Sequence, residues 1–474
     1  MKYYYQKVLF LPATLVFLLP VSVYGSSGAP HMDGRNISLL WALPFVGILL
    51  SIAIFPLIIP HIWHRHYGKI SLFWSLLFIS LLTIHYGFNV SAYYVLEVYL
   101  LEFLPFIILL LALFTVSGGI HLRGSMVGTP VVNTVILLLG TFLASWMGTT
   151  GAAMLLIRPL IRANSWRTHK THIIVFFIFL VANIGGSLTP LGDPPLFLGF
   201  LKGVSFFWTT KYLIKEMIAA VAILIVIFFI IDFLYYKQET QRPLKNENDE
   251  KINIEGKANF VLLAAIVGAV IASSFDLGKA FTIHHVSMPL ASLLQVVLLI
   301  IITVISIKIT KKEVREGNEF SWEPIKEVAK LFAAIFITMV MPIAMLKAGA
   351  DGPLGIVIKS VVDGNGNFIN SHFFWATGAL SSFLDNAPTY VIFFETAGGN
   401  AAELMTTYSE TLAAISIGAV FMGANTYIGN APNFMVKSIA EERGIPMPSF
   451  FGYMLKYSIP ILIPLFIIIT IIFF

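Results

Sequence analysis

The chain alternates between long apolar stretches and short polar segments, and this pattern predicts its fold. Each apolar stretch is near or above the roughly 20 residues that an α-helix needs to cross the hydrocarbon core of a bilayer. The C-terminal stretch 461–474 does not alternate apolar and polar residues as a membrane β-barrel strand would. We therefore expect an all-α polytopic membrane protein with about ten transmembrane helices. The expected spans are residues 38–60, 71–87, 93–118, 173–200, 206–236, 258–275, 288–308, 330–347, 411–440 and 450–474.

The positions of Lys and Arg predict how these spans are oriented. Positive charge gathers in the cytoplasmic loops of membrane proteins. The chain has five basic segments, which we expect in the cytoplasm: 61–69, 121–124, 158–172, 237–257 and 308–330. The fourth of these is predicted to be a solvated cytoplasmic linker between two halves of the protein.

This orientation requires two segments that enter and leave the membrane on one face. Residues 130–164 are largely apolar, yet basic segments precede and follow them, so we expect a re-entrant helical hairpin with its turn at 145–151. Residues 372–398 lie between segments without Lys or Arg, and their turn is at 381–389. We expect this second hairpin to enter from the opposite face. Such turns are tolerated at membrane depth where protein covers them or where they line a cavity.

An internal repeat relates the two halves. The stretch "TPLGDPPLF" (189–197) matches "TYIGNAPNF" (426–434) at an offset of 237 residues, and the same offset places Leu143–Ser145 on Leu380–Ser382. We therefore predict an inverted repeat of residues 38–236 and 258–474, with broken helices at 173–200 and 411–440. Paired helices broken by Gly and Pro are the best sequence indication of a secondary transporter's binding site.

The broken helices also indicate the chemistry. A helix interrupted at the membrane midplane exposes unpaired N–H groups where one half begins and unpaired C=O groups where the other half ends. Those carbonyls, with nearby Ser, Thr and Asn oxygens, can replace the water around a small cation. Asp193 and Asn430 are expected to cap the restarted half-helices, because a proline follows each closely. A carboxylate at membrane depth is costly and usually functional, so Asp385 and Asp193 are the predicted sodium ligands. The full set of predicted substrate and ion ligands is Asp385, Asn386, Thr389, Asp193, Thr189, Asn183, Ser145, Thr149, Ser382, Asn425, Thr426 and Asn430.

Two stretches resemble a known group of transporters. "ANIGGSLTPLGDPP" (182–195) and "FLDNAPT" (383–389) resemble the broken-helix and hairpin motifs of the ion transporter superfamily, which includes NhaD-type sodium/proton antiporters, arsenite permeases and citrate transporters. The chain is most similar to the branch described as sodium:proton antiporters or citrate transporters. The resemblance implies a homodimer whose protomers each have a scaffold and a mobile region that moves like an elevator. The first hairpin reads "SWMGTT" instead of a second Asp-Asn turn, which departs from a symmetric two-site arrangement.

Composition narrows the classes of function. The chain is 57% hydrophobic and 12% charged, whereas soluble proteins are about 25% charged. It has no cysteine, which excludes disulfides, thiolate metal sites and cysteine nucleophiles. The net charge of +5 does not indicate a nucleic-acid partner. We expect an integral protein of a bacterial inner (plasma) membrane. Residues 1–27 have the pattern of a signal peptide, or alternatively of a short first helix.

The leading functional hypothesis is a sodium/proton antiporter without a resident cofactor. The alternatives are a citrate or dicarboxylate symporter coupled to sodium or protons, and a carrier of a neutral solute. Two Asp and no Lys or Arg in the site motifs favour antiport. An aspartyl protease and a channel fit the broken, repeated helices less well, so we expect no enzyme. Two further acids, Glu97 and Glu102, either belong to a proton path or lie near the outer surface. The histidines of segment 61–69 are read as part of a basic cytoplasmic anchor in preference to a metal site.

Overall fold

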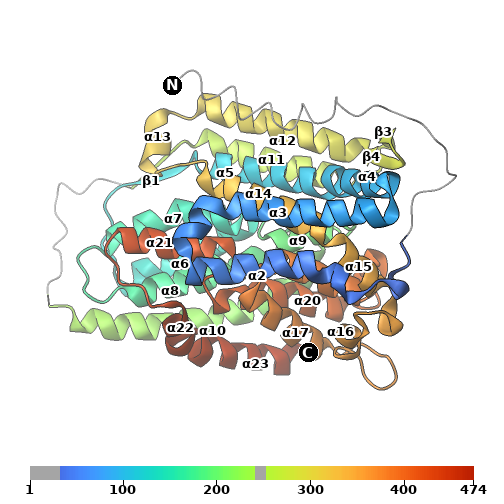
Figure 1. Ribbon diagram of the computed structural model, residues 1–474. Coiled ribbons are helices and arrows are strands. Elements are labelled where there is room, and N and C mark those ends of the chain that lie inside the picture. The colour runs from blue at the N-terminus through green and yellow to red at the C-terminus, as the bar shows by residue number, and fades with distance from the viewer. Residues whose placement is uncertain (1–31, 241–251) are drawn as a thin grey trace. The chain divides into compact units, whose positions relative to one another are not determined.

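The computed structural model describes residues 32–240 and 252–474, and these are mostly helical (Figure 1). The predicted all-α polytopic membrane fold is confirmed. Within this part of the chain, eight helices are long and apolar enough to cross a membrane: Leu39–Ile58, Arg65–Tyr86, Phe88–Ser117, Pro130–Met147, Trp208–Gln238, Leu290–Ile309, Glu323–Lys347 and Phe450–Phe473. Two apolar helices are shorter, Thr171–Ser187 and Ala258–Ala272. The predicted signal peptide (1–27) lies outside the described residues.

The first half of the chain contains the first hairpin and the first broken helix. Its elements are the 3-10 turns η1 (Gly34–Asn36) and η2 (Leu39–Ala42), α2 (Leu43–Ile58), α3 (Pro60–Tyr86), α4 (Phe88–Glu97), the π-helical turns η3 (Val98–Phe103), α5 (Leu104–Ser117), α6 (Pro130–Met147), α7 (Thr149–Ala163), α8 (Thr171–Leu180), η4 (Ile184–Ser187), α9 (Pro194–Leu201) and α10 (Trp208–Gln238).

The second half contains the corresponding elements. These are α11 (Ala258–Ala272), α12 (Leu290–Ile309), α13 (Lys312–Gly317), α14 (Glu323–Thr338), α15 (Val340–Lys347), η5 (Gly349–Asp351), α16 (Gly355–Lys359), α17 (Asn370–Phe383), α18 (Asn386–Thr396), α19 (Ala401–Met405), α20 (Ser409–Met422), η6 (Gly423–Asn425), α21 (Ala431–Glu442), α22 (Phe450–Tyr453), the π-helical turns η7 (Met454–Leu462) and α23 (Ile463–Phe473).

Two small antiparallel sheets join the connecting segments. Strand β1 (His121–Arg123) pairs with β2 (Asn253–Glu255), so that Leu122 lies opposite Ile254. Strand β3 (Lys279–Ile283) pairs with β4 (Val286–Pro289). The described end of the predicted linker 237–257 therefore contains a paired strand, where the sequence suggested only a solvated connection.

The predicted hairpins correspond to two helix pairs, α6 with α7 and α17 with α18. In the first pair the backbone N–H of Gly128 donates to the carbonyl of Ala163 at 2.8 Å, so both outer ends lie together. Its turn is Gly148, whose φ of +82° lies in the left-handed region that favours glycine. In the second pair the rings of Phe373 and Phe393 lie 6.4 Å apart between their centroids. The path of either hairpin through a membrane stays a prediction.

Each broken helix packs against elements from the other half of the chain. The first comprises α8, η4 and α9, and the second comprises α20, η6 and α21. Helix α9 packs on α18 and α20, while α21 packs on α7 and α8. Each restarted half-helix therefore contacts elements of the opposite repeat. This arrangement brings the two interruptions together, and the opposite orientation of the repeats in a membrane stays a prediction.

Two basic segments differ from the loops that the sequence suggested. Residues 61–69 form the first turns of α3, because Pro60 starts the helix and fits its first position. In segment 158–172, Arg167 is fully buried and forms an ion pair with Asp232 of α10, with 2.6 Å between Nη2 and Oδ1. Asp232 Oδ1 also lies 2.8 Å from His172 Nε2. Charge in this segment is therefore partly buried and paired in the interior, and does not only face water.

Candidate functional site

Close backbone contacts hold each broken helix in its shape. The structure folds η4 back on the start of α9, so a Cβ added at Gly192 would overlap the backbone of Gly186. The same holds in the second repeat, where a Cβ at Gly429 would overlap the backbone of Gly423 and lie 2.8 Å from the carbonyl oxygen of Ser381. Only glycine fits at these points of approach.

The hairpin turns are tied to the broken helices by the same hydrogen bonds in both repeats. Thr189 Oγ1 donates to the carbonyl of Ser145, and Thr426 Oγ1 donates to the carbonyl of Ser382 at 2.5 Å. Ser145 Oγ donates to the carbonyl of Gly185 at 2.5 Å, and Ser382 Oγ donates to that of Met422 at 3.1 Å. These predicted site residues therefore connect hairpin to broken helix, and their hydroxyl groups already have partners.

Asp193 lies where the two broken helices meet, with 1% of its surface exposed. Its Oδ1 accepts hydrogen bonds from Thr149 Oγ1 at 3.1 Å and from Asn430 Nδ2 at 3.0 Å. Its Oδ2 accepts one from Asn386 Nδ2. The carboxylate thus has donors from the first hairpin, the second hairpin and the opposite broken helix.

The predicted capping roles of Asp193 and Asn430 are wrong. Both residues have the extended backbone of an N-cap position, but neither side chain accepts a hydrogen bond from its own half-helix. Asn430 instead donates to the carbonyl of Ala182 at 3.1 Å and to Asp193. The physical reason is the crossing itself, which offers each side chain partners from other segments. Sequence reasoning from one helix at a time does not contain those partners.

Asp385 has a different environment. It is the N-cap of α18 and accepts a hydrogen bond from the backbone N–H of Ala387 at 3.1 Å, while Thr389 Oγ1 donates to its carbonyl at 3.0 Å. Unlike the neighbouring Asn386, which is fully buried, Asp385 keeps part of its surface exposed. Its carboxylate lines a cavity.

Three amide oxygens near the crossing are buried without a hydrogen-bond partner: those of Asn183, Asn386 and Asn425. The orientation of each amide is set by its nitrogen. Asn183 Nδ2 donates to Asn433 Oδ1 at 2.7 Å, and Asn425 Nδ2 donates to Ser382 Oγ at 2.9 Å. Unpaired buried oxygens are rare in proteins and require an explanation. Hard cations prefer oxygen ligands of this kind.

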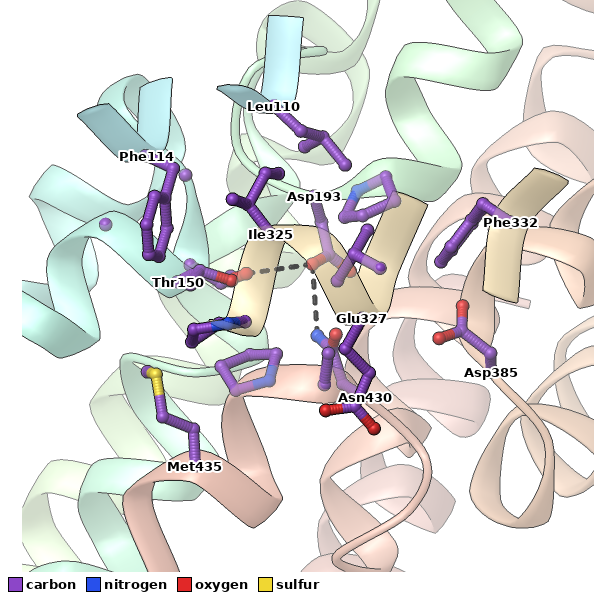
Figure 2. Close-up of a pocket in the computed structure, with 18 of the residues that line it drawn as sticks. Leu110, Phe114, Thr150, Asp193, Ile325, Glu327, Phe332, Asp385, Asn430 and Met435 are labelled. Carbon is purple, nitrogen blue, oxygen red and sulfur yellow. Dashed lines mark hydrogen bonds between the residues drawn. The ribbon is translucent and has the colours of Figure 1, made fainter. Parts of the chain in front are cut away.

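The cavity has a volume of about 400 Å³ and lies between the broken helices, α2, α3, α5 and α14. Four carboxylates line it: Asp193, Asp385, Glu323 and Glu327 (Figure 2 labels three of them). No Lys, Arg or His is among the described residues that line it. The remaining wall is largely apolar and aromatic, with side chains such as Phe114 and Phe332.

Four of the predicted site residues line this cavity: Asp193, Asp385, Asn430 and Thr149. The other eight lie outside its lining: Asn386, Thr389, Thr189, Asn183, Ser145, Ser382, Asn425 and Thr426. Sequence reasoning missed Glu323 and Glu327, which belong to segment 308–330. Their spacing of four residues, which places both on one helix face, was the available signal.

The span Glu323–Lys347 begins at the cavity, and a cluster of ion pairs lies at its other end. Lys202, at the end of α9, lies 2.8 Å from Glu395 of α18 and 3.9 Å from Glu102 of η3. Lys347, at the end of α15, lies 3.8 Å from Glu395. Glu97 instead accepts a hydrogen bond from the Tyr93 hydroxyl at 3.0 Å, so the two predicted acids have separate partners.

Comparison with known proteins identifies the family. Residues 34–474 match a family described as "Putative citrate transport". The chain belongs to this family. It is also similar to proteins named uncharacterized transporters in Mycobacterium bovis and Mycobacterium tuberculosis. Each is 25% identical over 342 residues, which covers 70% of this chain and 74% of the relative.

Membership in the putative citrate transport family supports a transporter, in agreement with the broken helices. The matched range contains both hairpins, both broken helices and every residue that lines the cavity. The family thus supports the transport function predicted from the sequence. The family description also names a substrate, citrate, whose binding must be reconciled with the acidic side chains of the cavity.

Proposed function

We propose that the protein is a secondary active transporter that exchanges sodium ions for protons. The observation that carries this proposal is the charge of the cavity's lining: four carboxylates and, among the described lining residues, no basic side chain. One of the four, Glu323, pairs with Lys326 outside the lining at 2.8 Å, so the excess negative charge comes from the other three. A cation gains from that charge, whereas a free multiply charged anion is repelled by it. Burial strengthens both effects at Asp193, because water screens that charge less.

Asp385 and Asp193 take different roles in this proposal. Asp385 faces the cavity, and its carboxylate accepts a hydrogen bond from the backbone N–H of Ala387, so we take it as the first ligand that an entering cation meets. Asp193 lies behind it with three side-chain donors. A sodium ion bound by the two carboxylates would be released when they take up protons, which couples the two ions by competition for one negative site.

The unpartnered amide oxygen of Asn386, whose nitrogen donates to Asp193, is an additional candidate ligand. Asn386 thereby connects the second hairpin to the first broken helix. Binding of a cation there would draw the hairpin and both broken helices together. The ion would then bind the contracted arrangement more tightly than the open one, and a transport cycle requires such a difference in affinity.

The access to the cavity supports a one-sided opening. Glu323 begins α14 and is exposed, with 73% of its side chain accessible, whereas Lys347 ends the same span with the ion-pair cluster around Glu395. The cavity thus reaches the end where basic segments are predicted to be cytoplasmic. We place the protein in a homodimer whose mobile regions move as elevators in a bacterial inner membrane, with this arrangement as the cytoplasm-facing state.

A citrate symporter is the second candidate, and the family description favours it. The half-helix starts at Pro194 and Ala431 border the cavity and carry the positive end of a helix dipole, which attracts carboxylates. Citrate would still meet four acidic side chains. It would therefore enter together with cations that offset this charge.

Reconstituted vesicles distinguish the two candidates. With a pH indicator inside, addition of sodium to proteoliposomes should release protons for the antiporter and leave labelled citrate outside. The symporter should accumulate labelled citrate and require sodium or a pH gradient to do so. Empty vesicles give the background. Citrate uptake without any sodium-driven pH change would overturn the antiport proposal.

A further inference from the structure

A second, smaller cavity lies away from the transport site and shares no lining residue with it. Its volume is about 70 Å³, and three separate segments line it. Helix α7 contributes Arg158, Ile161 and Arg162, the end of α13 and the segment after it contribute Gly317 and Glu319, and the residue after α21 contributes Arg443.

The charges of this cavity do not balance. Three guanidinium groups face one carboxylate, Glu319. Glu319 Oε2 accepts a hydrogen bond from Arg158 Nε at 3.1 Å, and its Oε1 accepts one from Arg443 Nη2. Arg162 Nη2 donates to the carbonyl of Leu122 at 2.9 Å. Two positive charges therefore remain without a counter-charge among the residues that line the cavity.

One hydrogen-bond donor of the cavity, on Arg158, has no partner among the described residues. The Arg158 side chain is 10% exposed, and its Nη1 is buried without a hydrogen-bond partner. A buried unsatisfied donor on a charged group costs free energy that a bound acceptor would recover. The unused donor and the excess positive charge belong to the same cavity, so both point to an acceptor with negative charge.

We propose that this cavity binds an oxyanion of the phosphate type. Arginine side chains favour such groups because two parallel N–H donors match two oxygens. A volume of about 70 Å³ is several times the roughly 10–15 Å³ that one water needs, and it suits one small tetrahedral anion. The bound anion would connect α7, the segment after α13 and α21. Its source is either free phosphate or a lipid headgroup at this basic end of the protein.

Thermal melting of the purified full chain tests the site and separates the two sources. One arm adds potassium phosphate, with potassium chloride at equal ionic strength as its control. The other arm adds phosphatidic acid to the detergent micelles, with phosphatidylcholine as its control. The variants are Arg158→Gln and Arg162→Gln. The matched control is Lys312→Gln, which removes one positive charge from an exposed side chain of α13.

We expect phosphate, phosphatidic acid or both to raise the melting temperature of the wild type and of Lys312→Gln. The apparent affinity should fall at least about tenfold in each Arg variant, as expected for the loss of a charge-assisted hydrogen bond. A response to phosphate identifies free anion, and a response to phosphatidic acid alone identifies a headgroup. No response in either arm, or equal responses in the wild type and both Arg variants, would overturn the proposal. Arg162 is exposed, so its variant keeps the test valid if Arg158→Gln fails to fold.

Discussion

Asn430 donates a hydrogen bond to Asp193 at 3.0 Å, and these two residues occupy equivalent positions of the internal repeat, 237 residues apart. The equivalent points of two broken helices therefore contact each other directly. Two carboxylates at this distance would repel, whereas an amide and a carboxylate attract. The asymmetry of the repeat, with Asp in one half and Asn in the other, places a single carboxyl group at the crossing.

The first prediction concerns this contact. Asp193→Asn should lower stability by about 1–3 kcal/mol, because an amide nitrogen would then face one of the amide donors of Asn386 and Asn430. Asn430→Asp should also destabilise, by placing two carboxylates together. The double variant restores one carboxylate and one amide at the crossing. It should be more stable than the two single effects added together.

Two measurements check this prediction: melting of the purified variants and sodium-driven pH change in vesicles. Asp193→Asn should lose or weaken the dependence on sodium, and the double variant should recover part of it. Simple additivity of the three stability changes would mean that the contact is not energetically coupled. Unchanged ion dependence in Asp193→Asn would remove Asp193 from the transport mechanism.

The second prediction separates folding from transport at Asp385. Asp385→Asn should keep the cap of α18, because Asn caps a helix about as well as Asp. Asp385→Ala loses that cap and should cost about 1 kcal/mol. Both should abolish ion-coupled transport in proteoliposomes. Asp276→Asn, in an exposed connecting segment, is the control and should transport normally. Normal transport by Asp385→Asn would exclude this carboxylate as a ligand.

The sequence predicted the general architecture because that part depends on local signals. Apolar length identifies a span, and Gly and Pro mark where a helix breaks, whatever surrounds them. The start of α9 at Pro194 and of α21 at Ala431 follows from those signals alone. The repeat was visible because the Gly, Pro and Thr residues that shape each break recur at one offset. In the structure, Thr189 and Thr426 make the same contact in each half.

The site chemistry was less predictable, because it depends on contacts between distant segments. Asp193 is an N-cap by sequence, yet its partners come from α7, α18 and the residue before α21. Glu327 joins the cavity only because α14 packs beside the broken helices, and it lay within a segment interpreted as a basic loop. Arg167 was assigned to that kind of loop as well, although Asp232 draws it into the interior.

The third prediction tests the orientation of the hairpins with single cysteines, which the chain otherwise lacks. Ser125 and Ser165 flank the first hairpin, and Asn365 and Ala402 flank the second; all four are exposed. Ser125→Cys and Ser165→Cys should react with a membrane-impermeant reagent from the cytoplasmic side. Asn365→Cys and Ala402→Cys should react from the other side. Labelling of the two ends of one hairpin from opposite faces would show that it crosses the membrane.

The fourth prediction concerns pH. Burial acts to raise the pKa of Glu239, but hydrogen bonds from the backbone N–H groups of His169 and Thr168 outweigh it and hold that pKa below its ordinary value. Glu239 follows the last residue of α10, outside the span. A lowered pKa stabilises the folded state above the ordinary pKa of Glu, about 4.3, and this contribution is lost as pH falls through the lower folded value.

Glu239→Gln should therefore destabilise the protein at pH 7, and the difference from the wild type should shrink from about pH 5 downward. Melting curves of both proteins between neutral and acidic pH measure this difference directly. A gap between the two proteins that is constant with pH would mean that the charge of Glu239 is not the source of its effect.

The last prediction concerns the buried pair of Arg167 and Asp232. Asp232 also accepts a hydrogen bond from Asn133 of α6 at 3.0 Å and contacts His172 of α8, so one carboxylate connects the first hairpin, the first broken helix and α10. Asp232→Asn would leave the Arg167 charge buried and unpaired, and we expect a loss of about 3–5 kcal/mol of stability. Replacing both, as Arg167→Met with Asp232→Leu, should cost much less, because it removes the unpaired charge together with its partner. Denaturation of the two variants in detergent, with the exposed Lys312→Gln as control, distinguishes these cases. A double variant as unstable as Asp232→Asn would mean that the hydrogen bonds to Asn133 and His172, and not the charge of Arg167, hold the hairpin to α10.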